Sequence, residues 1–405
     1  MDRSSTSLGQ RLYMLFSNYG DYTAFSNNVI SSVNSSYDSL ESLHDTVHNM
    51  AGGGGVGLLG GHMAYIPYSA FDPIFFLHHT MVDRIFAIWQ ELYPNSWITP
   101  RAALLPSYTT SSGQIQDSRT ALTPFFASTN GTFWTSDMVR DHRIFGYTYP
   151  ELNSSAGTKP KPKRQDNVAE IRKAINRLYG SSSPAYLFIK AAMAKRANNG
   201  DLNNRQSLAL TPDHDNATDT QERENHSRSA IKSLSGVVFV ENRFHEWIAN
   251  INVNKQALNG PFSIHLFLGE VPPAGPQSWS TAPSHIGSMG VFASGDGSTG
   301  VTIPMKTHQK HAVDISGTIP LTKTLVDKVV RGELKSLNPA DVEEHLRMNL
   351  KKRVLRLTDG KVFEAPECDR VPGLRVHIIG TVVRAPATDE ELPSWGEEDS
   401  RFDMY

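Results

Sequence analysis

Two histidines four residues apart, His44 and His48, are the first feature of this 405-residue sequence that could perform chemistry. If the run from Leu40 to Asn49 is a helix, the two imidazoles lie one turn apart on the same face. Their ring nitrogens can then converge on one metal ion. For an isolated pair of this kind, the alternative interpretation is two solvent-exposed histidines without a ligand.

A second pair, His78 and His79, lies in an apolar segment with the start signals of a helix, Asp72 as N-cap and Pro73 at the first helical position. Two stripes recur at helical spacing: His79, Val82, Phe86 and Trp89, and beside it His78, Met81, Ile85 and Leu92. We therefore expect His79 to face the core. A buried imidazole needs a partner for its nitrogens, and a shared metal ion would supply one.

The run LHDTVHN, followed by GGHM and AFDPIFFLHHTMVDRIFAIWQ, resembles the second copper site of the type 3 copper proteins. This family contains tyrosinases, catechol oxidases and molluscan haemocyanins, and the chain resembles the fungal tyrosinases (polyphenol oxidases) most closely. The resemblance implies that His44, His48 and His79 bind copper, with His78 as a neighbour outside the ligand set. The segment from Phe145 to Glu151 is similar to the tyrosine-x-tyrosine segment that closes the family's catalytic domain.

Two acids beside the first ligand also correspond to family positions. Glu41 precedes His44 by three residues and matches the acid that holds a water near the copper, a water associated with deprotonation of a phenol. Asp45 follows His44 where many monophenol-oxidising members have asparagine. The resemblance thus implies catalytic roles for Glu41 and Asp45, whereas by themselves both would read equally well as a solvated helix face.

The ligands of a first copper are not recognisable in this sequence. A coupled site in this family uses three histidines for each of two copper ions, and the first three precede the second set. No histidine precedes His44 here, and His62 and His142 do not repeat the required spacing. We therefore expect an N-terminally truncated chain with part of a four-helix bundle missing, apolar helix faces exposed, and oxidase activity impaired.

The elements that must position these residues suggest an α+β multidomain protein. Residues 1–152 read as a mainly helical copper domain with a partial four-helix bundle. Residues 153–235 read as a linker with short helices near 167–179 and 184–197, open to proteolytic activation. Residues 236–385 read as a β-sandwich-like cap, similar to the C-terminal domain that lies over the copper entrance of latent fungal tyrosinases, and residues 386–405 as a loose acidic tail. The expected strands are 237–240, 262–268, 301–303 and 374–383, interrupted by a helical insertion at 320–350.

Composition excludes several other classes of protein. A net charge of −2 and a basic run at 159–164 without interleaved aromatic residues argue against nucleic-acid binding. No apolar run is long enough for a membrane span, and the N-terminus is a poor signal-peptide core, which is compatible with a soluble cytoplasmic protein or with a shortened gene model. The single cysteine, Cys368, excludes an intramolecular disulfide and a CxxC metal site.

Three functions remain open at this point. The first is a tyrosinase-like oxidoreductase that hydroxylates monophenols and oxidises o-diphenols to o-quinones with dioxygen in a melanin-type pathway. The second is a haemocyanin-like oxygen carrier, and the third a non-catalytic remnant that binds one copper or none. The small-molecule partners are a phenolic substrate and dioxygen in the first case and dioxygen alone in the second.

Overall fold

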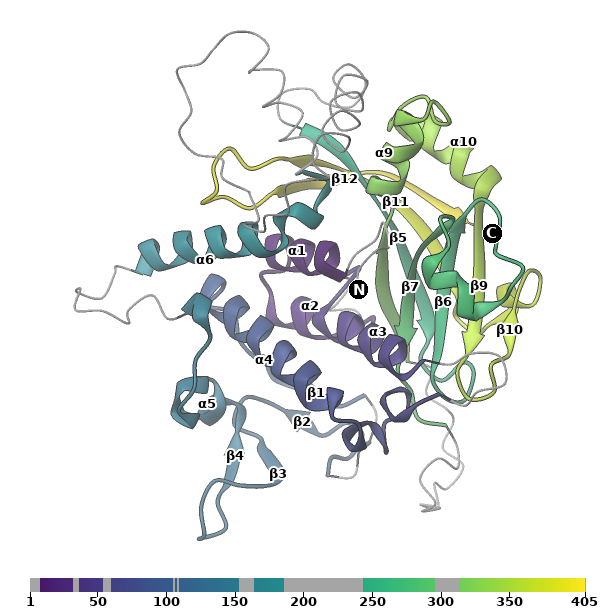
Figure 1. The fold of residues 1–405 in the computed structure, drawn as a ribbon. Helices are drawn as coiled ribbons and strands as arrows, with labels where there is room; N and C mark the ends of the chain where they lie inside the picture. The colour runs from purple at the N-terminus through teal and green to yellow at the C-terminus, as the bar shows by residue number, and fades with distance from the viewer. Residues whose placement is uncertain are drawn as a thin grey trace, which may run out of the picture.

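The computed structural model describes residues 8–31, 36–53, 60–104, 106–107, 109–152, 164–185, 243–295 and 313–404. The chain up to residue 185 forms mostly helices and the chain from residue 243 mostly strands, which confirms the α+β class (Figure 1). The helices of the first part are α1 (Leu8–Asn18), α2 (Tyr22–Ser26), α3 (Leu40–Gly52), α4 (Ile74–Leu92), α5 (Ser136–Val139) and α6 (Arg164–Tyr179). Short 3-10 turns lie at η1 (His62–Ala64), η2 (Ser69–Phe71), η3 (His142–Phe145), η4 (Pro150–Leu152) and η5 (Gly180–Ser182).

Helices α1, α3, α4 and α6 share one hydrophobic core. In α4, Ile85, Ile88 and Trp89 are buried because a spacing of three and four residues places them on one face. Helix α6 contributes Ile171 and Ile175 to the same core. It therefore packs as part of the helical region, although the sequence analysis assigned it to the linker. The rest of that linker lies outside the described residues, apart from the short stretch that follows α6.

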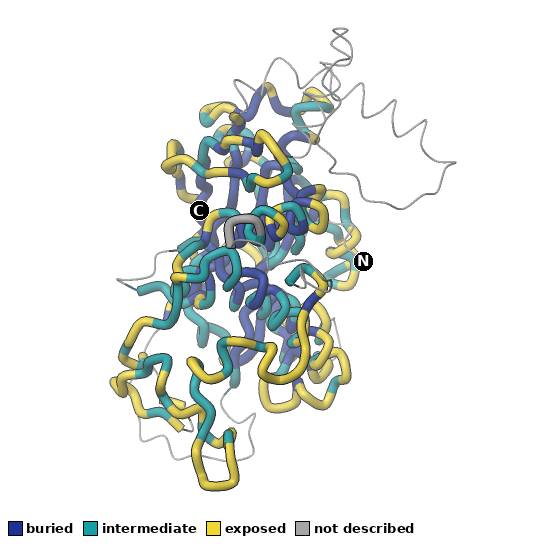
Figure 2. Tube along the Cα trace, turned by 90° about the vertical axis from the view of Figure 1, so that its left-hand side faces the viewer, coloured by how far each residue is buried: buried dark blue, intermediate teal, exposed yellow. Residues whose placement is uncertain are grey.

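The segment that closes the helical region is tied back onto α4. Tyr147 and Tyr149 both donate a hydrogen bond to Asp83 Oδ2, at 2.8 and 2.5 Å, and Arg84 forms an ion pair with Glu151. Between α4 and this segment lie two antiparallel strand pairs, β1 (Arg101–Ala102) with β2 (Ile115–Gln116) and β3 (Ala121–Phe126) with β4 (Phe133–Thr135). Strand β3 is largely exposed, β1 and β2 are exposed in part, and β4 is half-buried (Figure 2).

Two four-stranded antiparallel sheets pack face to face in the second part. One has the order β12-β11-β5-β8 and the other β10-β9-β6-β7. The strands are β5 (Arg243–Asn254), β6 (Phe262–Leu268), β7 (His285–Val291), β8 (Asp314–Pro320), β9 (Leu350–Arg356), β10 (Val362–Phe363), β11 (Arg375–Arg384) and β12 (Ser394–Met404). Side chains of both sheets, such as Trp247, Ile264 and Ile378, form one core between them. We call this sandwich the cap.

The expected strands at 262–268 and 374–383 are confirmed as β6 and β11, and those at 237–240 and 301–303 lie outside the described residues. The helical insertion is confirmed as α9 (Thr322–Val330) and α10 (Pro339–Asn349), and the cap also contains η6 (Pro276–Thr281) and η7 (Cys368–Arg370). In the part of the chain that the structure describes, no helix is both long and apolar enough to span a membrane.

The expectation of a loose acidic tail is wrong for residues 394–404. They form β12, which pairs with β11 from Arg384↔Ser394 to Val376↔Met404 with a bulge near Gly380. The segment is ordered as a strand because its apolar side chains, Trp395, Phe402 and Met404, pack against the cap core. The charged residues between them lie on the exposed side of an edge strand, where they protect it from pairing with other chains.

Helix α3 lies against both edge strands β7 and β8 of the cap. At Gly290 of β7 an added Cβ would meet the main chain of α3 at 2.7 Å, and at Gly317 of β8 it would meet Ser42 Oγ at 2.5 Å. On the same helix, Asn49 Nδ2 donates to the carbonyls of Phe262 and Val291 at 2.8 and 3.2 Å. The helix that bears His44 and His48 is therefore packed directly onto the cap.

Candidate metal centre

Helix α3 presents His44 and His48 on one face, as the spacing predicts. Ser39 is its N-cap, since the Ser39 hydroxyl accepts a hydrogen bond from Ser42 N at 3.1 Å, and Gly53 ends it with a φ of +63°. The two imidazole centroids are 4.5 Å apart. A local sequence signal therefore suffices to bring these two rings together.

Helix α4 supplies the second histidine pair. Its first turn is stabilised by Asp72, whose side chain accepts from Ile74 N at 3.1 Å, while Pro73 lies at the N-cap. This start is one residue later than the sequence suggested. The ring of His79 stacks on Phe75, with centroids 4.1 Å apart.

The crossing of α3 and α4 gathers all four histidines into one group. One ring nitrogen from each of His44, His48, His78 and His79 lies within 4.8 Å of the others, and the structure shows no other such group among the residues it describes. His48 Nε2 and His79 Nε2 are 3.3 Å apart. Converging imidazole nitrogens at this separation are a donor set for copper, zinc or another transition metal.

His78 differs from the prediction in its burial. The sequence stripes placed His79 towards the core, but His78 is 8% exposed and His79 is only half-buried. Both stripes reach the helical core, since Ile85 of the His78 stripe and Trp89 of the His79 stripe are buried in it, so the stripes alone do not determine which histidine is more buried. The structure therefore brings His78 into the group of nitrogens together with His79.

Hydrogen bonds outside the group orient two of the rings. His44 Nδ1 lies 3.0 Å from Asp45 Oδ1 and His48 Nδ1 lies 2.9 Å from the Met63 carbonyl. Both acceptors require a proton on Nδ1, which leaves each Nε2 with a free lone pair. A carboxylate or carbonyl behind a histidine is the arrangement that orients metal ligands in proteins.

The electrostatics of the group favour neutral imidazoles. Burial, together with the neighbouring histidines, lowers the pKa of His48 to about 4 and the pKa of His78 to about 3. Burial likewise lowers the pKa of His79. Near neutral pH these rings are therefore unprotonated, the state in which a ring nitrogen can bind a metal ion.

The two acids occupy different environments. Asp45 is 2% exposed, and burial raises its pKa against the opposing contribution of its hydrogen bond to His44. Glu41 has a third of its side chain exposed; its Oε2 accepts from Asn28 N at 3.1 Å and its Oε1 lies 3.4 Å from Lys255 Nζ of the cap. Asp45 contacts a histidine of the group directly, whereas Glu41 lies between the helical part and the cap.

A cap residue that the sequence did not point to covers the group. The ring of Phe292, directly after β7, stacks on His48 with a centroid separation of 4.2 Å and an interplanar angle of 18°, and meets His44 edge-on at 6.2 Å. Phe292 is 8% exposed. No local pattern distinguishes this phenylalanine, since its contacts with α3 exist only after the cap has packed on the helix.

The donor set fits a copper ion. It offers imidazole nitrogens of His44, His48 and His79 within reach of one centre, and His78 lies in the same group. Imidazole nitrogen is a preferred ligand of both oxidation states of copper.

Comparisons with known proteins agree with this reading of the site. The family described as the common central domain of tyrosinase matches residues 1–92, and the tyrosinase C-terminal domain matches residues 246–378. A tyrosinase of Neurospora crassa is 31% identical and its alignment covers 97% of this chain. A tyrosinase of Podospora anserina is 32% identical over 82% of this chain.

The chain spans 62% of the length of the Neurospora protein and 57% of the Podospora protein. Among solved structures, recombinant mushroom tyrosinase has a similar fold, with a TM-score of 0.65 and 20% sequence identity over 98% of this chain and 62% of that one. The similarity runs through the helical region and the cap alike, and on that ground the chain belongs to the tyrosinase family, whose proteins use copper.

Proposed function

We propose that this chain carries the second-copper half of a tyrosinase-type phenol oxidase, with His44, His48 and His79 as copper ligands. The observation that carries the proposal is the convergence of imidazole nitrogens from α3 and α4 under a cap that also matches the family. The substrate class is phenols, and the co-substrate is dioxygen. Monophenol hydroxylation and o-diphenol oxidation are both included, since Asp45 and asparagine can orient the same water by hydrogen bonding.

Copper, when bound, supplies the redox chemistry that couples dioxygen reduction to oxidation of a phenol. The chain's own residues do the rest. Asp45 holds His44 with Nε2 free, and the Met63 carbonyl does the same for His48. Glu41, a third of whose side chain is exposed, would hold a water that takes the phenol proton. Phe292 occupies the space above His48 and so restricts the approach of a ring-shaped substrate.

The number of copper ions bound per chain tests whether the histidine group of α3 and α4 is accompanied by a second copper site. A chain with only the histidine group of α3 and α4 would bind one copper and would not oxidise phenols, because the reaction needs two electrons from a copper pair. One copper per purified chain with no quinone formation supports the proposal that α3 and α4 carry a single copper site. Two coppers per chain, with oxidation of a monophenol or an o-diphenol, would instead require a second ligand set in residues outside the described ranges.

Replacing His48 with alanine is expected to weaken copper binding about a hundredfold, since it removes one ligand and its backing bond to Met63. The measurement is a competitive titration against a copper chelator of known affinity. His62→Ala is the matched control, because His62 is exposed on η1 and lies outside the histidine group. Equal affinities of the His48 and His62 variants would contradict the assignment.

Replacing Phe292 with alanine is expected to open the centre to small aromatic ligands. Stacked aromatic pairs contribute about 0.5–1.5 kcal/mol, so benzoate should bind the copper-loaded variant roughly tenfold more tightly once the ring no longer competes for the space. The readout is the perturbation of the copper spectrum by benzoate. Phe363→Ala, elsewhere in the cap, is the control and should leave benzoate binding unchanged; an equal effect of both variants would argue for general loosening of the cap.

A further inference from the structure

A short segment of the helical part pairs with the edge of the cap next to the metal centre. Ser316 N donates to the Asn28 carbonyl and Ile30 N donates to the Asp314 carbonyl, both at 2.8 Å, while Val29 bridges to Ile315. Residues 28–30 thus extend the sheet beyond β8 by a few main-chain contacts. This pairing fixes the position of the Asn28 backbone relative to the cap.

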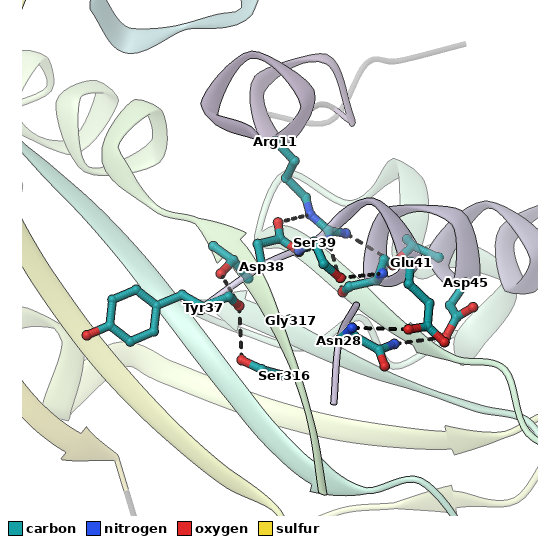
Figure 3. A network of polar contacts seen from close by, with 12 residues as sticks. Arg11, Asn28, Tyr37, Asp38, Ser39, Glu41, Asp45, Ser316 and Gly317 are labelled. Atoms are coloured by element: carbon teal, nitrogen blue, oxygen red, sulfur yellow. Dashed lines mark hydrogen bonds and ion pairs between the residues drawn. The ribbon is translucent and has the colours of Figure 1, made fainter. Parts of the chain in front are cut away.

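The same Asn28 contacts both acids of the centre (Figure 3). Its main-chain N–H donates to Glu41 Oε2 at 3.1 Å, and its side-chain Nδ2 donates to Asp45 Oδ2 at 3.2 Å. Asn28 is 2% exposed, so water does not compete for these hydrogen bonds. The other carboxylate oxygen of Asp45, Oδ1, lies 3.0 Å from His44 Nδ1.

We propose that Asn28 is a positioning residue through which the edge strand of the cap orients the acids beside the metal centre and, through Asp45, the ring of His44. The order of contacts is β8, Asn28, Asp45, His44. This inference rests on the proposed function only in that the histidine group binds copper. It assigns the cap a role as a scaffold of the site in addition to a cover.

Two further observations support a role in orientation. The side-chain Oδ1 of Asn28 is buried and accepts no hydrogen bond, so half of the hydrogen-bonding capacity of this amide group is unused. A buried acceptor without a partner lowers stability, and the hydrogen bond that the side chain does form is the one to Asp45. Lys255, which follows β5 of the same sheet, contacts Glu41 Oε1 at 3.4 Å. Both acids are therefore held by residues that the cap positions.

The test is a double-mutant cycle with two readouts on the full chain. The first is the tautomer of His44 in metal-free protein, from the ring nitrogen shifts of protein labelled with ¹⁵N-histidine. The second is the copper dissociation constant. Asn28→Ala should raise the fraction of His44 with its proton on Nε2 and weaken copper binding about tenfold, the range seen when a residue behind a metal ligand is lost. In the Asp45→Asn background, Asn28→Ala should have no further effect on either readout.

Asn27→Ala is the matched control, since the Asn27 side chain accepts from Val29 N in the same segment. It should leave the His44 tautomer unchanged. If Asn28→Ala does not fold, Asn28→Ser keeps the main-chain pairing and is tested in the same cycle. Full additivity of Asn28→Ala and Asp45→Asn, or an unchanged His44 tautomer, overturns the inference. A wild-type chain that binds no copper overturns the proposed function, while the tautomer shift would still support the role of Asn28.

Discussion

Replacing Asp38 with alanine is expected to destabilise the protein by about 3–5 kcal/mol. Asp38 and Arg11 are 3% and 4% exposed and form a two-pronged ion pair, with Arg11 Nε and Nη2 at 2.8 and 2.6 Å from the two carboxylate oxygens. The variant would leave the guanidinium buried without a counter-charge. Its remaining partners, the hydroxyls of Ser42 and Thr46, are neutral and cannot offset the lost carboxylate.

The pair connects α1 to the start of α3, the helix that carries His44 and His48 (Figure 3). The measurement is chemical denaturation of metal-free wild type and variant. Glu343→Ala breaks the partly exposed pair with Arg347 on α10 and should cost only about 0.3–0.5 kcal/mol. Adding Arg11→Met to Asp38→Ala should recover part of the loss, because it removes the unpaired charge. A loss for Asp38→Ala no larger than the surface control would contradict the account of a buried, paired charge.

Replacing Glu246 with glutamine is expected to remove a loss of stability that develops as the pH rises from about 4.5 to about 7. Glu246 lies on β5, 2% exposed, and burial raises its pKa to about 7, only slightly offset by contacts with Gln10 and Trp395. In the unfolded chain the carboxyl has its ordinary pKa of 4.5. The folded protein therefore holds this proton more tightly. The contribution to stability is complete below pH 4.5 and is lost as pH rises through 7, a loss of about 3 kcal/mol.

Glutamine keeps the shape of the side chain and does not ionise, so the variant should lack this loss. The difference in the free energy of unfolding, variant minus wild type, should grow in favour of the variant between pH 5 and pH 8. Taking the difference cancels the histidine group, whose lowered pKa values give the opposite slope as pH falls below 6.5. Glu344→Gln, at an exposed glutamate of α10, is the control for the chemical change of glutamate to glutamine. A difference for Glu246→Gln that does not vary with pH would show that its carboxyl ionises normally in the folded protein.

The parts of the fold that were predicted correctly depend on neighbours in the sequence. Helix α3 has its N-cap and its pair of histidines within one short run, and α4 has its start signal and apolar stripe in another. Strands β6 and β11 are continuous runs of β-branched and aromatic residues that fit a buried sheet. Helical and strand periods are local properties, and therefore they could be read without coordinates.

The errors have a common cause in long-range packing. Residues 394–404 look like a charged tail until the apolar Trp395 and Phe402 find the cap core, and only then does the segment pair as β12. Helix α6 reads as part of a linker until Ile171 and Ile175 meet the helical core. In both cases composition suggested exposure, and a few apolar residues at the right spacing determined burial.

By itself, the sequence determined that α3 and α4 each carry two histidines that could hold a metal ion, because four-residue spacing and an adjacent pair fix their places on the two helices. Only the tertiary structure decided how the centre is enclosed. Met63 behind His48, Phe292 above it and Asn28 behind Asp45 come from segments that no local pattern joins to the histidines. The Phe292 contact arises when the cap packs on α3, and the Met63 and Asn28 contacts arise when their loops fold against the same helix. In all three, the hydrophobic effect and the loss of solvent from polar groups act between residues that no local pattern links.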